Sequence, residues 1–264
     1  MTPFVSVIIP AFNAQAFISD TIESVIGQSY QNWELIVVDD CSVDLTIQIV
    51  KRFSAIDPRI KLLTTPSNSG GPAFPRNMGM GASQGDLIAL LDADDIWHFE
   101  KLRIQVDAYN LTKTKMLSTG MTDFTLSRPT RHDSPLAVAF RSITLNDQLI
   151  KYRTPTSSLM LHRDLLNYVK FNESPWLRGR EDLEFSIRVH NQFGHSLKVE
   201  TPLVFYRRHR EQLSRSKFRM FMTTFWVILS TNLGRYNVLK LMLPLYIASN
   251  IWYSIYYRII RGSL

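Results

Sequence analysis

Three carboxylates stand close together after a short apolar run near the middle of the chain. Asp92, Asp94 and Asp95 follow residues 87–91, a run typical of a strand buried on both faces of a parallel sheet. Like charges crowded at a strand end are costly unless a cation offsets them. Mg²⁺ and Mn²⁺ take oxygen ligands, including those of phosphate. The triplet predicts a divalent-metal site, although Asp92 or Asp94 could simply cap a helix beginning near Trp97.

A second acidic pair, Glu181 and Asp182, follows a loop that contains Gly179 and precedes a predicted helix. A helix N-terminus favours an ionised carboxylate, as a general base requires. The alternative is a pair that only caps the first turn. Farther on, His209 is surrounded by Arg residues, and it is either solvated or folded back onto a metal or diphosphate.

The elements that must position these groups alternate between strand and helix. Apolar runs predict strands at residues 5–9, 33–38, 60–63, 87–91, 157–161 and 203–206, and helical spacing predicts helices at 13–28, 44–53, 77–83 and 97–110. This order indicates an α/β fold with βαβ units and a parallel sheet. Ligands of such sheets bind at the carboxyl ends of strands, where Asn13, Asp39, Asp40 and the acidic triplet would lie.

The loop at residues 68–77 contains two Gly and two Pro and leads to Arg76 at the start of a helix. An Arg in that place can pair with phosphate, or it can be an ordinary surface residue. The chain contains neither a Gly-x-Gly-x-x-Gly fingerprint nor a Gly-Lys-Ser/Thr loop, so the sequence predicts neither dinucleotide binding of that type nor a P-loop.

Charge and cysteine content bound the setting of the protein. Its 264 residues carry a net charge of +7, but residues 201–264 alone carry +9 and residues 1–200 carry −2. The single Cys41 excludes an intrachain disulfide and fits a reducing compartment. Residues 4–9 are apolar without a basic region or a cleavage site before them, so we expect the catalytic part to remain in the cytoplasm.

The basic tail predicts an anionic partner. Residues 220–234 and 241–257 are largely uncharged, shorter than the ~20 residues that span a bilayer, rich in Trp and Tyr, and flanked by Lys and Arg. We expect interfacial helices that bind an anionic membrane surface. A homodimer interface and core helices covering the sheet are the alternatives. The stretch is too apolar for a nucleic-acid groove, so no nucleic acid is expected.

Taken together, the motifs resemble family 2 of the inverting glycosyltransferases, which have the GT-A fold. The resemblance covers about residues 4–214 and rests on Val5 to Asn13, Val37 to Asp44, Asn68 to Asn77, the Asp92-Ala93-Asp94-Asp95 cluster and Arg180-Glu181-Asp182. It implies a GT-A catalytic domain at residues 1–214, a Rossmann-like mixed sheet flanked by helices. Residues 215–264 would form a separate amphipathic helical region.

The resemblance also implies roles for individual residues. Asp182 would be the catalytic base, and Asp94, Asp95 and His209 would hold Mn or Mg. The nucleotide-sugar donor would be held by Pro10, Phe12, Asn13, Asp40, Arg76, Asp92, Ala93, Glu181, Trp176 and Arg208.

These expectations combine into one functional hypothesis. The chain would transfer a sugar from a nucleotide sugar, UDP-linked by resemblance, to a glycan or lipid-linked saccharide at the inner face of a bacterial plasma membrane. The product would be a surface polysaccharide or lipopolysaccharide. A metal-dependent nucleotidyltransferase and a non-catalytic, membrane-recruited binding module are the alternatives.

Overall fold

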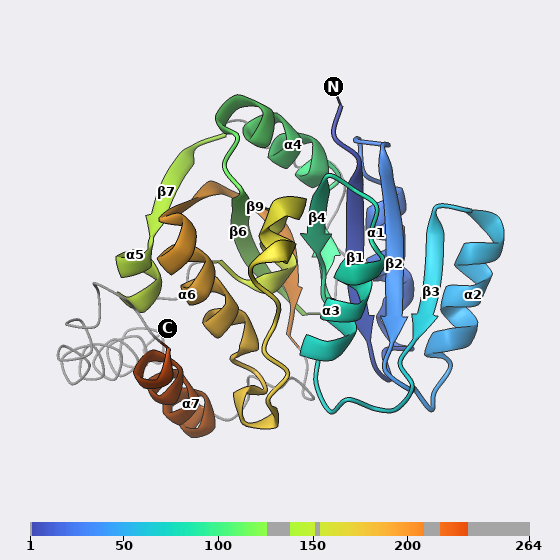
Figure 1. The fold of residues 1–264 in the computed structure, drawn as a ribbon. Coiled ribbons are helices and arrows are strands. Elements are labelled where there is room, and N and C mark those ends of the chain that lie inside the picture. The colour runs from blue at the N-terminus through green and yellow to red at the C-terminus, as the bar shows by residue number, and fades with distance from the viewer. Residues whose placement is uncertain (1, 126–137, 151–153, 209–216, 232–264) are drawn as a thin grey trace, which may run out of the picture.

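A single mixed sheet forms the centre of the protein (Figure 1). The computed structural model describes residues 2–125, 138–150, 154–208 and 217–231. Within them, nine strands follow the order β3–β2–β1–β4–β8–β6–β9–β5, and β7 pairs with β9. The strands are β1 (Val5–Ala11), β2 (Trp33–Asp39), β3 (Ile60–Thr64), β4 (Leu87–Leu90), β5 (Ile96–Trp97), β6 (Met116–Phe124), β7 (Phe140–Thr144), β8 (Met160–His162) and β9 (His195–Arg207).

Helices cover both faces of this sheet. They are α1 (Ile18–Ile26), α2 (Thr46–Ile56), α3 (Ala73–Ala82), α4 (Lys101–Thr112), α5 (Leu145–Ile150), α6 (Glu181–Phe193) and α7 (Lys217–Ser230), with short 3₁₀ turns η1 (Thr156–Ser158), η2 (Arg163–Asn167) and η3 (Pro175–Leu177). One apolar cluster joins the sheet to α1, α2 and α4. A second cluster joins the opposite face to α3 and α6, which lie in front of the sheet in Figure 1.

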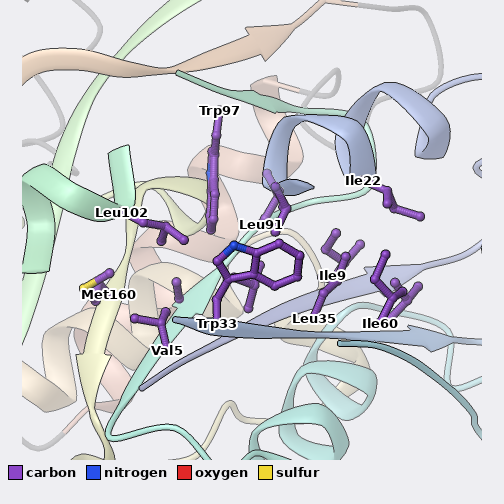
Figure 2. Packing of buried hydrophobic residues seen from close by; sticks show 14 of the residues in the cluster. Val5, Ile9, Ile22, Trp33, Leu35, Ile60, Leu91, Trp97, Leu102 and Met160 are labelled. Carbon is purple, nitrogen blue, oxygen red and sulfur yellow. The ribbon is translucent and has the colours of Figure 1, made fainter. Parts of the chain in front are cut away.

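Side-chain alternation along the central strand feeds these two clusters. Val5, Val7 and Ile9 of β1 face the first cluster, whereas Ile8 faces the second. Figure 2 shows Trp33 in the middle of the first cluster, with Ile9 and other aliphatic side chains around its ring. A strand buried on both faces needs apolar residues at every position, which explains the unbroken apolar runs in the sequence.

The parallel core that the sequence predicts is confirmed. β1 pairs in parallel with β2 and β4, and β2 pairs in parallel with β3. The registers place Ala11 opposite Asp39 and Ile8 opposite Leu90, so β1, β2 and β4 end at the same edge of the sheet. The polar residues that follow these strands are therefore brought together.

Two predicted boundaries are wrong because of pairings between distant parts of the chain. Trp97 does not begin a helix: Ile96 and Trp97 form β5, paired antiparallel with Val204 and Phe205 of β9, and α4 begins only at Lys101. The strand predicted at residues 157–161 is shorter, because its first part is the turn η1 and only residues 160–162 form β8.

The helix α7 packs on the same unit as the sheet. Val227 and Ile228 of α7 share an apolar cluster with Leu177 and with Leu183 of α6. No helix in the described ranges combines the length and the apolar character needed to cross a bilayer. Residues 232–264, which contain the second apolar segment of the tail, lie outside the described residues.

A close approach between α3 and the sheet gives a first prediction. A Cβ added at Gly79 would lie 2.5 Å from Cγ2 of Ile8 and 3.1 Å from Cγ2 of Val38, both in the core. We expect Gly79→Ala to lower the free energy of unfolding by about 1–3 kcal/mol, as overpacking does. Chemical denaturation monitored by circular dichroism measures this change.

Gly81 on the same helix is the matched control. A Cβ there meets nothing within 4 Å. Gly81→Ala should therefore raise the free energy of unfolding by about 0.5–1 kcal/mol through the lower entropy of the unfolded chain. Equal effects of the two substitutions would show that α3 is not seated on the sheet through Gly79.

Candidate active site

One cavity of about 720 Å³ lies at the edge where the parallel strands end. It is lined by most of the residues that the sequence singles out: Pro10, Phe12, Asn13, Asp40, Arg76, Asp92, Ala93, Asp94, Glu181 and Asp182. They come from the ends of β1, β2 and β4 and from the first turns of α3 and α6. Segments more than one hundred residues apart are thus combined in one site, which is large enough for a small-molecule ligand.

Asp40 is held rigidly at one end of this cavity. Its buried carboxylate accepts hydrogen bonds from Thr65 Oγ1 at 2.9 Å, from Ser69 N at 3.0 Å and from Ser69 Oγ at 2.8 Å. Asn68 Nδ2 donates to the Asp40 carbonyl at 3.0 Å. The loop that follows β3 therefore fixes the orientation of Asp40, so this carboxylate is preorganised.

Phe12 and Asn13 form the neighbouring wall. The Phe12 side chain is 50% exposed, which is unusual for an aromatic ring and leaves it accessible from the cavity. Asn13 has a left-handed backbone, with φ of 48°, and its Oδ1 accepts a hydrogen bond from Val43 N at 2.9 Å. Its own N–H donates to Ser42 Oγ at 2.9 Å. These bonds tie the end of β1 to the loop after β2.

Arg76 links the two acidic groups of the site. Its Nη2 lies 2.7 Å from Asp92 Oδ1 and its Nη1 lies 2.9 Å from Glu181 Oε1, and the guanidinium is buried. We expected Arg76 to pair with phosphate, but both terminal nitrogens contact carboxylates of the protein. The side chain therefore joins the loop after β4 to the start of α6.

The three carboxylates of the acidic triplet have different surroundings. Asp94 lines the cavity, as does Asp92. Asp95 instead points into the protein, where its Oδ2 accepts a hydrogen bond from Ser157 Oγ at 2.5 Å and its Oδ1 accepts one from Arg207 N at 3.1 Å. Burial, together with the charge of Asp94, raises the pKa of both Asp92 and Asp95, and the Arg76 charge opposes this for Asp92.

Asp182 is half-buried at the start of α6, as the sequence predicts. Burial and the neighbouring Glu181 carboxylate raise the pKa of Asp182 to about 6, while the charges of Arg180 and Arg76 act in the opposite direction. Thr156 Oγ1 donates a hydrogen bond to Asp182 Oδ2 at 3.4 Å. A carboxylate with this pKa is ionised at neutral pH yet basic enough to accept a proton.

Glu181 has a different task from its neighbour. Besides its ion pair with Arg76, its Oε2 accepts a hydrogen bond from Gly179 N at 2.7 Å. Gly179 has a φ of 83°, a conformation that favours glycine. Glu181 thus shapes the loop before α6, leaving Asp182 with its carboxylate at the cavity.

Several residues predicted for the site lie elsewhere. Trp176 lines a different cavity. Arg208 pairs with Asp123 at 2.8 Å, and it does not line the donor cavity, because β9 turns its side chain toward β6. The oxygens of Asp95 are engaged inside the protein, so the predicted role of Asp95 as a metal ligand does not fit. His209 lies outside the described residues.

Sequence reasoning missed other lining residues, including Asn68, Thr156, Arg178 and Tyr206. Arg178 is exposed, and of the two cations among the described lining residues it is the one without a carboxylate partner. Its aliphatic stem passes Gly71, where an added Cβ would lie 3.7 Å from Cγ of Arg178. Its position four residues before Asp182 was the available signal, because the loop that delivers the base must also border the cavity.

The donor set suits a metal shared with a ligand. Within the part of the chain that the structure describes, no three His, Cys, Asp or Glu side chains are gathered to hold a metal by themselves. Asp94 offers a carboxylate to the cavity. Mg²⁺ commonly binds one or two carboxylates together with substrate phosphates, and this arrangement fits that pattern.

Comparison with known proteins identifies the family. The sequence profile described as "Glycosyl transferase family 2" matches residues 6–167. The chain belongs to this family. It is 31% identical over 228 residues to the putative teichuronic acid biosynthesis glycosyltransferase TuaG of Bacillus subtilis, covering 85% of this chain and 87% of the relative. It is 48% identical over 102 residues to the Escherichia coli UDP-Glc:alpha-D-GlcNAc-diphosphoundecaprenol beta-1,3-glucosyltransferase WfgD, covering 39% of each chain.

Solved structures share the fold. Staphylococcus aureus TarS 1–349 in complex with UDP-GlcNAc superposes with a TM-score of 0.70 at 22% identity, covering 89% of this chain and 69% of that one. The Pyrobaculum calidifontis mannosyltransferase PcManGT in complex with GDP-Man and Mn²⁺ gives 0.63 at 19% identity, covering 86% and 64%. The predicted GT-A fold and glycosyltransferase family are confirmed, and this family 2 member is a glycosyltransferase.

The raised pKa of Asp182 gives a stability prediction. Its pKa is about 6 in the folded protein against an ordinary 3.8, so ionising it above pH 6 costs stability, and this cost disappears as the pH falls toward 4. We expect Asp182→Asn to raise the melting temperature at pH 7–8, with a gain that shrinks at acidic pH. Thermal unfolding across pH 4–8 measures the difference from the wild type.

Asp57 provides a control of opposite sign. The hydrogen bond from Arg59 lowers the pKa of Asp57, so its ionised form stabilises the fold at neutral pH and this stabilisation is lost on acidification. Asp57→Asn should therefore lower the melting temperature at pH 7, with a smaller effect at low pH. A loss of stability in Asp182→Asn at pH 8 would contradict the assigned environment of Asp182.

Proposed function

We propose that this chain transfers a sugar from a UDP-linked donor to a hydroxyl of a glycan or lipid-linked saccharide, with inversion at the anomeric carbon. The observation that carries the proposal is the single cavity that combines Asp40, Asp94 and Asp182. A nucleotide site and a carboxylate with a pKa of about 6 in one cavity are what a direct displacement needs. This proposal keeps the donor roles of Pro10, Phe12, Asn13, Asp40 and Asp92 and adds Arg178.

The relatives support the choice of product. TuaG is named for teichuronic acid biosynthesis, WfgD for glucosyl transfer to a diphosphoundecaprenol-linked sugar, and TarS for N-acetylglucosaminyl transfer to poly(ribitol-phosphate). All three names describe bacterial glycan assembly. We infer a role in synthesis of a bacterial cell-surface polysaccharide, lipopolysaccharide included. Family membership favours glycosyl transfer over nucleotidyl transfer and over a non-catalytic binding module.

The chemistry follows from the residues around the cavity. Asp182 accepts the proton of the acceptor hydroxyl while that oxygen attacks the anomeric carbon from the side opposite the departing UDP. One bond forms as the other breaks, so the anomeric configuration inverts without a covalent enzyme intermediate. Only one basic carboxylate is required, unlike the carboxylate pair of glycoside hydrolysis.

The leaving group requires positive charge. Asp40, Asp92, Asp94, Glu181 and Asp182 surround the cavity with carboxylates, which would repel a diphosphate. We propose that Asp94 holds Mn²⁺ or Mg²⁺ together with the phosphate oxygens and that Arg178 binds the same phosphates. A metal bound there would stabilise the charge on the departing diphosphate. The role of His209 as a further ligand stays a prediction from the sequence.

Enzyme kinetics test these roles. We expect Asp182→Asn to lower kcat by about 10²–10⁴-fold with little change in the KM for the donor, as loss of a general base does. In the wild type, kcat/KM should fall as the pH drops below about 6, because protonated Asp182 cannot accept the proton. Release of UDP from a panel of UDP-sugars with Mn²⁺ present measures both.

Two further variants separate the steps in the same assay. Asp94→Ala should abolish the dependence of turnover on added metal along with most of the activity. Arg178→Met should raise the KM for the donor about tenfold, the effect of one lost charge-assisted hydrogen bond. Full activity in Asp182→Asn or Asp94→Ala would overturn the proposed function.

We also propose that residues 215–264 bind an anionic membrane surface. In α7, the residues Met222, Trp226 and Leu229 are 39%, 56% and 38% exposed and share one face of the helix. The opposite face carries Val227 and Ile228 into the core. An exposed apolar stripe with a Trp, beside a sequence segment of charge +9, suits the interface of an anionic bilayer.

Vesicle binding tests this surface. We expect Trp226→Gln to weaken co-sedimentation of the full-length protein with vesicles containing phosphatidylglycerol, and added salt to weaken it further. Leu111→Gln on α4 is the control, because Leu111 is 77% exposed but lies outside the basic segment. Equal losses in both variants, or none in Trp226→Gln, would remove α7 from the membrane contact.

A further inference from the structure

A second cavity of about 480 Å³ lies beside α6. Glu184, Arg188 and Gln192 line it, and their spacing of four residues places them on one face of the helix. Asp182 is two residues before Glu184 and therefore about 200° away around the helix axis. The second cavity is thus on the side of α6 opposite the carboxylate that borders the donor cavity.

Two exposed aromatic side chains border this second cavity. Trp176 is 52% exposed and Tyr168 is 61% exposed. The Tyr168 ring is held edge-on against Phe193, with ring centroids 5.6 Å apart. Flat aromatic surfaces that stay accessible and fixed can stack on the apolar C–H face of a sugar ring. Such a pair costs little entropy to order on binding.

The polar groups of the second cavity balance each other in charge. Arg188 Nε lies 2.6 Å from Glu184 Oε1, and Arg188 Nη2 donates to Glu184 Oε2 at 2.8 Å and to the carbonyl of Lys170. The amides of Asn172 and Gln192 are also in the lining. This set offers donors and acceptors without net charge, which suits a neutral polyol. The Glu184 carboxylate opposes a phosphate there.

One loop connects the two cavities. Trp176 and Leu177 of η3 line the second cavity, and the next two residues, Arg178 and Gly179, line the donor cavity. A saccharide whose hydroxyl reaches Asp182 can therefore extend across this loop. We propose that the second cavity binds the acceptor glycan through neutral sugar units that precede the one being glycosylated. This inference rests on the proposed function, because it needs a saccharide acceptor.

Oligosaccharide binding to the full-length protein tests the inference. The probes are N-acetylglucosamine and its β-1,4-linked di- to tetramers, together with cellobiose and cellotetraose, each added to protein saturated with UDP. We expect saturation-transfer NMR to show binding that strengthens with chain length. Trp176→Ala and Gln192→Leu should each weaken the tightest probe at least tenfold. Trp226→Ala should leave it unchanged, because Trp226 is equally exposed but lies outside the lining.

The outcomes distinguish this inference from the proposed function. UDP binding measured by calorimetry reports on the donor cavity alone. If UDP binds but no probe binds, or if Trp176→Ala binds them as the wild type does, the acceptor site is overturned and the proposed function stands. If UDP does not bind, the proposed function itself fails. Shielding of Trp176 from an aqueous quencher by phospholipid vesicles but not by oligosaccharides would also overturn the inference, because the cavity would then face lipid.

Discussion

The ion pairs of Arg76 connect the two halves of the site. The guanidinium contacts Asp92 at the end of β4 and Glu181 at the start of α6, 105 residues farther along the chain than Arg76. A buried cation between two carboxylates offsets charges that would otherwise repel each other. Breaking a buried pair on one side leaves the other charge without compensation, which is strongly destabilising. The distance between the donor loop and the base helix is therefore set by electrostatics as well as by packing.

A second network holds the acidic loop from behind. Ser157 Oγ donates to Asp95 and accepts a hydrogen bond from Asp92 N at 3.1 Å, while Arg207 donates from Nε to the carbonyl of Asp94 at 2.9 Å. The loop after β4 is thus fixed by β9 and by η1. Asp95 supports the loop from the interior, and Asp94 keeps its place at the cavity. Neighbouring residues of identical type acquire different tasks from their surroundings.

The charge of the cavity carries a cost in stability that function explains. Burial raises the pKa of Asp92, Asp95 and Asp182, so keeping them ionised at neutral pH opposes folding. Strained electrostatics of this kind concentrates at functional sites. A cation brought by the substrate would relieve the repulsion, and it would favour the nucleotide-bound state over the free one.

The sequence by itself determined the parallel core, the edge at which ligands bind and the place of Asp182 at a helix start. These features depend on local apolar periodicity and on residues that directly follow predicted elements. Even the family could be inferred, because its motifs are short and contiguous.

Only the tertiary structure decided the partners of side chains. It paired Trp97 with β9, turned Asp95 inward, engaged Arg76 with two carboxylates and placed Trp176 in a separate cavity. Each of these outcomes joins residues that are far apart in the chain, for which no local pattern exists. The physical reason is that a buried charge or aromatic ring takes whichever partner the packed fold brings within reach, and spacing along the sequence does not encode that choice.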